Sequence, residues 1–191
     1  MNNIFPINTD NPSLKMHNKG NYWFFHKDSY PTDYPLLLNE IIKNANSHIE
    51  IFDPYFKVTG RRSDQNIFND ISNDITLKMI TISKQNINNY KRDVLNAVRI
   101  KITSSKNIRF GMRIIDENAP ADSGYVFHDR FLIIDQKDVY LVGSSIDYYL
   151  TPRKSSGIYK IDEENTIKFI QEIYTEYWNK GINNEIPIQF L

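Results

Sequence analysis

The residues of this sequence best suited to chemistry lie on one apolar run, "YVFHDRFLIIDQKDVY" at positions 125–140. His128 and Arg130 are two residues apart, so on a strand both side chains leave the same face, and Asp135 follows as the strand ends. Buried charged groups are costly unless they are paired or used. The run therefore has two interpretations, a reactive polar site or a stabilising network in which Asp135 simply satisfies a core histidine.

A short turn after the next apolar run adds hydroxyl groups to this set. Gly143, Ser144 and Ser145 follow "DVYLV", and we expect them close to the same end of the sheet as His128 and Arg130. An imidazole, a fixed cation, hydroxyl groups and backbone N–H donors together predict a receptor for a phosphate group.

Other charged residues have a functional and a structural interpretation side by side. Asp53 in "DPY" either contacts the phosphate site or ends a strand, as Asp-Pro commonly does. Arg61 and Arg62 form either a phosphate patch or a solvated helix start. Arg109 and Arg113 share one face of a predicted strand, which either lines the same cleft or faces solvent.

Composition limits the class of protein. The 191 residues carry 23 Lys and Arg and 23 Asp and Glu, so the formal net charge is zero and strong nonspecific attraction to nucleic acid is not expected. The chain has no cysteine, which excludes disulfides and thiolate metal sites and favours a reducing compartment. No apolar run approaches the length of a membrane span, and the polar first twenty residues lack a secretory signal. We expect a soluble cytoplasmic protein with no transmembrane segment.

Hydrophobic periodicity alternates between helix and strand along the chain. Helical spacing occurs over residues 35–45, 63–71, 87–102 and 162–180, and period-two spacing over 48–53, 75–83, 108–116, 125–135, 138–144 and 157–162. Asp162 is the expected N-cap of the last helix and Gly181 its end. Tyr174, Tyr177 and Trp178 on that helix are expected in the core rather than on a base-stacking surface.

Interleaved strands and helices predict an α/β fold with one mixed β-sheet flanked by helices. The length suits one domain, which we assign to residues 31–191. Residues 1–30 are an N-terminal extension, whose aromatic cluster "NYWFFHKDSY" adds an edge strand or packs against the domain.

The residues from His128 onward resemble the motif of the phospholipase D superfamily. That motif is His-x-Lys, four residues, Asp, some six residues and Gly-Ser; here it is His128-Asp129-Arg130, "FLII", Asp135, seven residues and "GSS". The sequence "IEIFDPYF" is similar to the first core strand of such domains. The resemblance covers roughly Asn39 to Lys180. Its His-Asp-Arg form is similar to that of single-motif bacterial members and, distantly, to the domain that follows MIT modules in ESCRT-associated proteins.

The resemblance implies a phospholipase D-like sandwich and a two-step phosphodiester exchange without metal or other cofactor. By transfer, His128 is the nucleophile or the general acid, Arg130 clamps the phosphate oxygens, and Asp135 orients the histidine. Ser144, Ser145 and Asp53 are further candidates for the phosphate site. In such a reaction, positioning and charge neutralisation carry most of the catalysis.

Two departures from the family motif shape the functional hypothesis. Arg130 replaces the lysine, and a planar guanidinium binds phosphate without reproducing the point charge of an ammonium group. The chemistry also uses two histidines, yet the chain has one motif, because neither "HNK" at residues 17–19 nor "HKD" at 26–28 has the required spacing. Activity therefore predicts a twofold homodimer in which two His128 side chains face each other.

Two functions remain open from the sequence. The first is a metal-independent phosphodiesterase or nuclease that acts as a homodimer through His128. The alternative is a catalytically inactive module in which the Arg130 pocket binds nucleic acid or a phosphorylated lipid headgroup, the latter with peripheral membrane binding.

Overall fold

The computed structural model describes residues 16–19, 21–25, 30–54, 56, 71, 74–83, 86–101, 107–116, 127–143, 156–179 and 185–190. In this part of the chain, nine strands form one sheet and helices α1 (Tyr30–Lys43), α2 (Ile87–Lys101) and α3 (Glu164–Asn179) pack on it. The strands are β1 (Met16–Lys19), β2 (Tyr22–Phe25), β3 (His48–Phe52), β4 (Thr76–Ser83), β5 (Arg109–Asp116), β6 (Phe131–Ile134), β7 (Asp138–Val142), β8 (Ser156–Ile161) and β9 (Glu185–Phe190).

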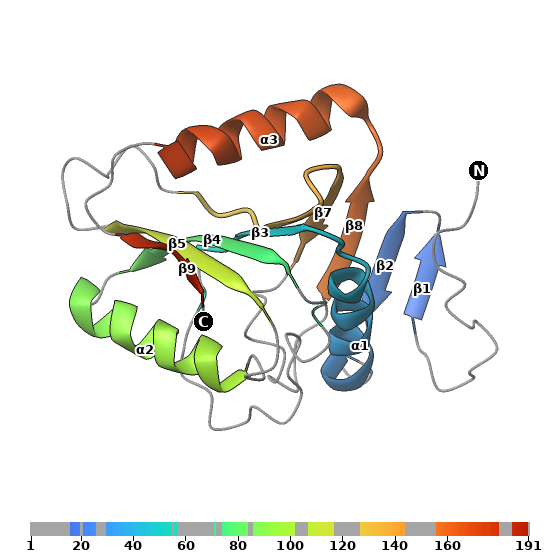
Figure 1. Ribbon diagram of the computed structural model, residues 1–191. Coiled ribbons are helices and arrows are strands. Elements are labelled where there is room, and N and C mark those ends of the chain that lie inside the picture. The colour runs from blue at the N-terminus through green and yellow to red at the C-terminus, as the bar shows by residue number, and fades with distance from the viewer. Residues whose placement is uncertain are drawn as a thin grey trace.

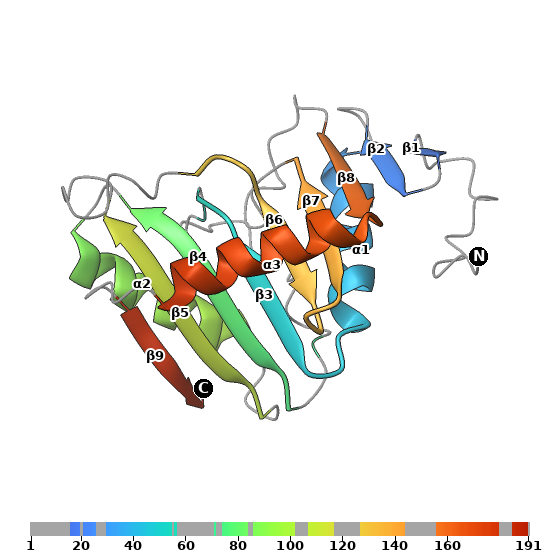
Figure 2. The same ribbon diagram turned by 90° about the horizontal axis from the view of Figure 1, so that it is seen from above.

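The sheet is mixed, as the sequence predicts. Its strand order is β1-β2-β8-β7-β6-β3-β4-β5-β9. Strands β3, β4 and β5 are parallel, and every other neighbouring pair is antiparallel. Helix α3 covers one face and helices α1 and α2 cover the other, so the fold has three layers (Figure 1). Seen from the α3 side, this helix runs obliquely across the sheet from β8 towards β5 (Figure 2).

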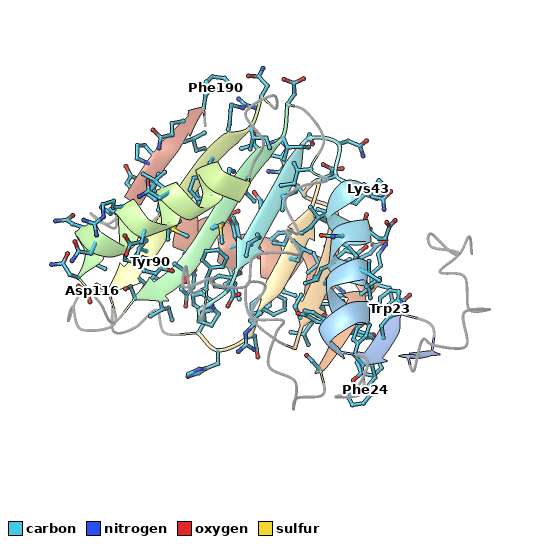
Figure 3. The ribbon with its side chains drawn as sticks, turned by 90° about the horizontal axis from the view of Figure 1, so that it is seen from below. Trp23, Phe24, Lys43, Tyr90, Asp116 and Phe190 are labelled. Atoms are coloured by element: carbon cyan, nitrogen blue, oxygen red, sulfur yellow. The ribbon has the colours of Figure 1, made fainter. Side chains whose placement is uncertain are left out.

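The larger hydrophobic core lies between the sheet and the pair α1 and α2. The apolar stripe of α1 is buried as predicted, with Leu38, Ile41 and Ile42 at 1% exposure or less. These side chains pack with Ile49 and Ile51 of β3, whose alternation marks the same face of the sheet. Figure 3 shows this side of the molecule with both helices lying along the strands.

A smaller core lies under α3. Ile170 and Tyr174 are buried there, and Tyr177 and Trp178 pack against the same cluster. Tyr174, Tyr177 and Trp178 therefore belong to this core, as the sequence predicts, whereas Phe169 of the same helix is exposed. No helix in the described ranges is long and apolar enough to cross a bilayer.

Both edges of the sheet come from the ends of the described chain. Strands β1 and β2 extend the sheet beyond β8, and β9 pairs with β5 at the other edge. Strand β9 was not predicted from the sequence. It contains Pro187, and proline within a sheet is confined to edge strands, strand starts and bulges.

The structure confirms most predicted elements and corrects two. The strand expected over 125–135 begins only at Phe131, because residues 127–130 do not form regular strand structure. The N-cap of α3 is Glu163 rather than Asp162: the Glu163 carboxylate accepts hydrogen bonds from the N–H groups of Asn165 and Thr166 at 3.0 and 2.6 Å. Of the helix predicted over 63–71, only Ile71 lies within the described residues. Gly181 also lies outside them.

Candidate active site

Several segments meet at one end of the sheet. Asp53 follows β3, residues 127–130 precede the antiparallel strand β6, and Gly143 follows β7, which is antiparallel to β6. These positions coincide because Phe52 pairs with Phe131, so the residue after β3 lies beside the residue before β6. The polar residues of the sequence motif are thus partly gathered at this end.

Asp53 is the most deeply buried acid of the site, at 0% exposure. Its N–H donates to the Ile80 carbonyl at 3.0 Å, which continues the parallel pairing of β3 with β4 for one residue. Its side chain forms an ion pair with Arg130, with 3.7 Å between Oδ1 and Nε. A buried carboxylate requires a partner of this kind because desolvation of an unpaired charge is costly.

Arg130 is held by two neighbouring segments, the end of β3 and the end of β7. Its guanidinium lies beside Asp53, and Nη1 donates to the Gly143 carbonyl at 3.4 Å. Its own carbonyl accepts a hydrogen bond from the Val142 N–H at 2.8 Å, so the backbone continues the ladder between β6 and β7. The side chain is 21% exposed, which leaves part of a fixed cation at the surface.

His128 lies at the surface, on the segment before β6. It lines a cavity of about 280 Å³ together with Asp129 and the aromatic rings of Phe127, Phe131 and Tyr177, and with Phe52, Phe169, Ile170 and Ile173. Phe52 and Phe127 stack inside this lining with ring centroids 3.6 Å apart. His128 thus lies between the polar residues at this end of the sheet and an aromatic cavity.

Gly143 is required by the close approach of β8. Its N–H donates to the Gly157 carbonyl at 2.9 Å, and a Cβ at this position would lie 2.7 Å from Ser156 Oγ and 3.0 Å from the Gly157 carbonyl oxygen. A side chain would push β7 and β8 apart at the point where Arg130 bonds to the Gly143 carbonyl. The glycine of the motif is therefore a packing requirement here.

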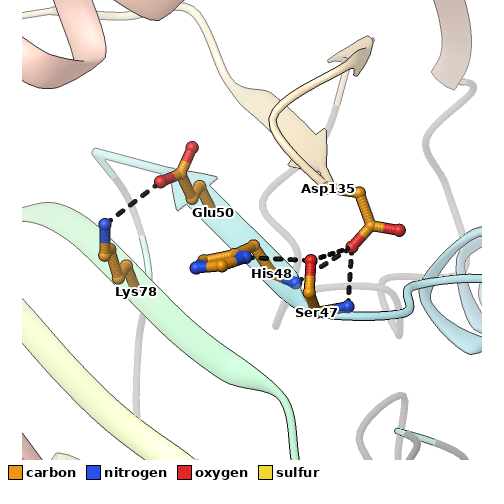
Figure 4. A network of polar contacts seen from close by, with 5 residues as sticks. All are labelled: Ser47, His48, Glu50, Lys78 and Asp135. Carbon is orange, nitrogen blue, oxygen red and sulfur yellow. Dashed lines mark hydrogen bonds and ion pairs between the residues drawn. The ribbon is translucent and has the colours of Figure 1, made fainter.

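Asp135 lies at the opposite end of β6 from His128. Its carboxylate accepts hydrogen bonds from the N–H groups of Ser47 and His48 and from the Ser47 hydroxyl, at 2.8 to 3.0 Å (Figure 4). The Asn46 N–H also donates to both carboxylate oxygens, at 3.1 and 2.9 Å. The expectation that Asp135 orients His128 is therefore corrected, because its contacts fix the loop before β3. Burial opposes ionisation, but the N–H donors outweigh it and hold the pKa of Asp135 well below its usual range.

The turn between β6 and β7 explains how Asp135 reaches that loop. Asp135 and Gln136 both have positive φ, 51° and 55°, and the Lys137 N–H donates to the Ile134 carbonyl at 3.0 Å. Two central residues with positive φ form a type I′ turn, which suits the twist of a hairpin. Aspartate tolerates this left-handed conformation better than most residues.

The remaining candidates are distributed as follows. Ser144, Ser145, Arg61 and Arg62 lie outside the described residues, and so does the "HKD" segment. Arg113 does not line the cavity beside His128; it binds the Trp178 carbonyl at 2.8 Å and forms an ion pair with Glu185. Arg109 is exposed on β5. In the described part of the chain, no group of three or more His, Asp or Glu side chains is placed to hold a metal ion.

A second polar cluster under α3 was not anticipated. Glu50, 5% exposed, forms an ion pair with Lys78 at 3.4 Å, and the two residues are direct partners on β3 and β4 (Figure 4). They line a cavity of about 400 Å³ with Tyr174, whose hydroxyl is buried and has no hydrogen-bond partner among the described residues. Burial and the charge of Glu50 raise the pKa of Tyr174. In the sequence, this cluster is indicated by Glu50 and Lys78, each a charged residue within an otherwise largely apolar strand.

Comparisons with known proteins give similarity in structure only. No family model matches the chain, and no curated protein sequence matches it. NucT from Helicobacter pylori matches with a TM-score of 0.51 and 14% identity, over 82% of this chain and 94% of that one.

Two further solved structures match at lower TM-scores. Nuc from Salmonella typhimurium, described as a phospholipase D family member, gives 0.43 at 14% identity over 82% of this chain and 89% of that one. The archaeal chromatin protein TrmBL2, described as having a novel mode of DNA binding, gives 0.44 at 14% identity over 84% of this chain. The chain spans about half of that protein, 53% of its length. With its single mixed sheet between helical layers, the chain shares the fold of NucT.

Proposed function

We propose that this protein is a metal-independent phosphodiesterase of the nuclease type, active as a homodimer through His128. The observation that supports the proposal is that His128, Arg130 and Gly143 lie at the same end of the sheet, where His128, but not Arg130, lines a cavity large enough for part of a substrate. The lack of cysteine agrees with action in the reducing cytoplasm.

The reaction needs a nucleophile, an acid and a clamp for the phosphate oxygens. In the first step, the nitrogen of one His128 attacks phosphorus, the P–O bond to the leaving group breaks, and a second histidine gives that oxygen its proton. In the second step, water attacks the phosphohistidine, loses its proton to the second histidine, and frees the first. The Arg130 guanidinium stabilises the non-bridging oxygens as charge develops on them.

The second histidine comes from a second copy of the chain in this proposal. The sequence has four histidines, of which His26 lies outside the described residues. His48 lies at the far end of β3, beside the Asp135 network, and therefore cannot reach the His128 end of the same sheet. His17 lies on the outermost strand β1, with β2, β8 and β7 between it and β6. A twofold axis near His128 places two equivalent imidazoles on one phosphorus.

The test is hydrolysis of bis-p-nitrophenyl phosphate and of single-stranded DNA in the presence of EDTA. We expect wild-type protein to release p-nitrophenolate and the His128→Ala variant to lose at least roughly a hundredfold in rate, as general acid–base and nucleophilic groups do. His48→Ala is the matched control, since it removes an imidazole from the other end of the sheet and should keep the activity. Wild-type protein without activity, or a His128→Ala variant with full activity, would contradict the proposal.

An inactive binding module is the second candidate, favoured by the ion pair of Arg130 with the fully buried Asp53. This pairing neutralises part of the charge that an active site would direct at phosphate. The same assay with Arg130→Lys separates the two functions. If only the Arg130→Lys variant hydrolyses the substrates, the protein is a phosphodiesterase that Arg130 has inactivated. If neither protein hydrolyses them, a module that binds nucleic acid or a phosphorylated headgroup is favoured.

A further inference from the structure

A row of apolar side chains crosses four neighbouring strands on the α3 face of the sheet. Tyr22 of β2 pairs with Tyr159 of β8, Tyr159 with Leu141 of β7, and Leu141 with Phe131 of β6. Residues directly opposite each other in an antiparallel pair point to the same face. Phe131 packs in the cluster under α3, so the whole row lies on that face. We call these four residues the aromatic strip.

The outer part of the strip is open to solvent. Tyr22 is 41% exposed, Tyr159 38% and Leu141 37%, unusually high values for large side chains on a sheet face that a helix packs against. Figure 2 shows the reason, because α3 passes over only one end of β8 and leaves β2 uncovered. Phe24, next but one to Tyr22 on β2, adds a further ring at a centroid distance of 6.4 Å.

The inner end of the strip enters the cavity at His128. Phe131 lines that cavity together with His128, Phe127 and the 61% exposed ring of Phe169. A ligand that lies along the strip from Tyr22 towards β6 therefore arrives beside the histidine proposed to react. Three strand-to-strand steps of about 4.8 Å make this path roughly 14 Å long, which suits two or three nucleotides.

The chemistry of the strip favours flat aromatic rings as its ligand. The rings of Tyr22 and Tyr159 stand side by side on neighbouring strands, 6.4 Å apart, and none of the four residues of the strip is charged. Aromatic side chains on an open sheet face bind bases by stacking, without a demand for one sequence. A bilayer is disfavoured as occupant, because α3 lies on the same face of the sheet and would meet a flat membrane first (Figure 1).

We propose that the aromatic strip binds single-stranded nucleic acid, with bases stacked on Tyr22 and Tyr159, and leads a backbone phosphodiester to His128. This inference rests on the proposed function and assigns its substrate class. The bases supply contact area at the strip, while Arg130 and His128 engage the phosphate. Duplex nucleic acid is excluded as a direct ligand of the strip, since its bases are already stacked and paired.

The test is fluorescence anisotropy of a labelled single-stranded oligothymidylate, with all proteins carrying His128→Ala so that the probe stays intact. Adding Tyr159→Ala should weaken binding roughly 5- to 150-fold, the range expected for one base–aromatic contact. Tyr159→Phe should retain the affinity because it keeps the ring. Phe190→Ala is the matched control, since Phe190 is an exposed ring, 66% accessible, on β9 at the opposite edge.

Four outcomes would overturn the inference. The first is that the parent His128→Ala protein does not bind the oligonucleotide, and the second is that Tyr159→Ala leaves its affinity unchanged. The third is that Tyr159→Ala abolishes binding to anionic phosphatidylglycerol vesicles but not to the oligonucleotide, which would make the strip a membrane contact. The fourth is that Tyr159→Ala halves the mass in light scattering, which would make the strip a contact between two copies of the chain. Circular dichroism establishes that each variant is folded. The result is distinct from that of the proposed function, because anisotropy needs no turnover and hydrolysis of bis-p-nitrophenyl phosphate by wild-type protein is measured separately.

Discussion

Asp135 and Arg130 belong to one sequence motif but serve different ends of the sheet. The Asp135 carboxylate takes hydrogen bonds from Asn46, Ser47 and His48, whereas the Arg130 guanidinium lies between Asp53 and the Gly143 carbonyl. A strand of four residues separates them. The Asp135 carboxylate therefore affects the candidate active site only indirectly, through the loop and hairpin that it holds in place.

The Asp135→Asn variant should lose about 1–2 kcal/mol of unfolding free energy at pH 7, because the amide removes one charge-assisted acceptor. Asparagine tolerates the positive φ, so backbone strain does not confuse the result. The folded pKa of Asp135 is depressed, so its contribution is full above the unfolded pKa of about 3.9 and is lost as pH falls towards the folded value. The difference between the two proteins in urea unfolding should therefore shrink below about pH 4.

Asp93→Asn serves as the control for that measurement. Asp93 is exposed and contacts only its neighbour Arg92 among the described ion pairs, so its replacement should change stability by no more than about 0.5 kcal/mol at any pH. An Asp135→Asn protein that follows the same flat profile would show that the loop does not depend on this carboxylate.

Among the elements, the junction of β7 and β8 controls the geometry of the candidate site. The Gly143 backbone lies against Ser156 and Gly157, and its carbonyl is the acceptor for Arg130. A shift of β8 therefore moves an Arg130 partner. This coupling makes the hairpin a support for the site rather than a passive connection.

Gly143→Ala should lower the unfolding free energy by about 1–3 kcal/mol, because the new Cβ meets Ser156 Oγ and the Gly157 backbone. It should also reduce hydrolysis through the displaced carbonyl. Adding Ser156→Ala removes the nearest clash and should restore part of the stability but not all, since the Gly157 carbonyl oxygen stays close. A single Gly143→Ala variant as stable as wild type in urea unfolding would refute this account.

The sequence predicted the elements whose apolar residues recur with regular helical or strand spacing. The stripes of α1, α2 and α3 and the alternation in β4, β5 and β7 were recognisable for that reason. Strand β9 was missed, because "EIPIQF" contains a proline and carries exposed Ile188 and Phe190 without a clear alternation. The strand before Phe131 was overextended, because Tyr125, Phe127 and the residues around them have strand-type composition. The division of the chain at residue 30 stays a prediction.

The site was only partly predictable for a different reason. The motif spacing placed His128 and Arg130 together, but it did not distinguish the two ends of β6, so Asp135 was assigned to the wrong end. Asp53 was a candidate by its place after a strand, and its pairing with Arg130 depends on the register of β3 with β6. Register arises from contacts between distant segments, which local periodicity does not contain.

For the whole molecule, the proposal requires two chains at each reaction. Light scattering at micromolar concentration should give a mass near twice the 22.5 kDa of one chain. Because the formal net charge of the chain is zero, two copies do not repel each other at long range, and the chain is not attracted to polyanions at long range. Association therefore depends on local surface fit around His128.

Mixing subunits tests the shared site directly. If both histidines act on one phosphorus, random exchange with an equal amount of the His128→Ala protein should reduce the activity of a fixed amount of wild type by roughly half. Adding the His48→Ala protein in the same way should increase the total rate. An activity that is unaffected by the His128→Ala protein after subunit exchange would mean that each chain works alone.

Strand β9 has a consequence for solubility. Its partner β5 is apolar on both faces, with Phe110, Met112 and Ile115 all buried, and would offer open backbone groups to any other strand if left uncovered. Pro187 has no N–H to donate, so the strand that shields β5 is itself a poor template for further pairing. The last strand thus protects the nine-stranded sheet from growing edge to edge into an aggregate.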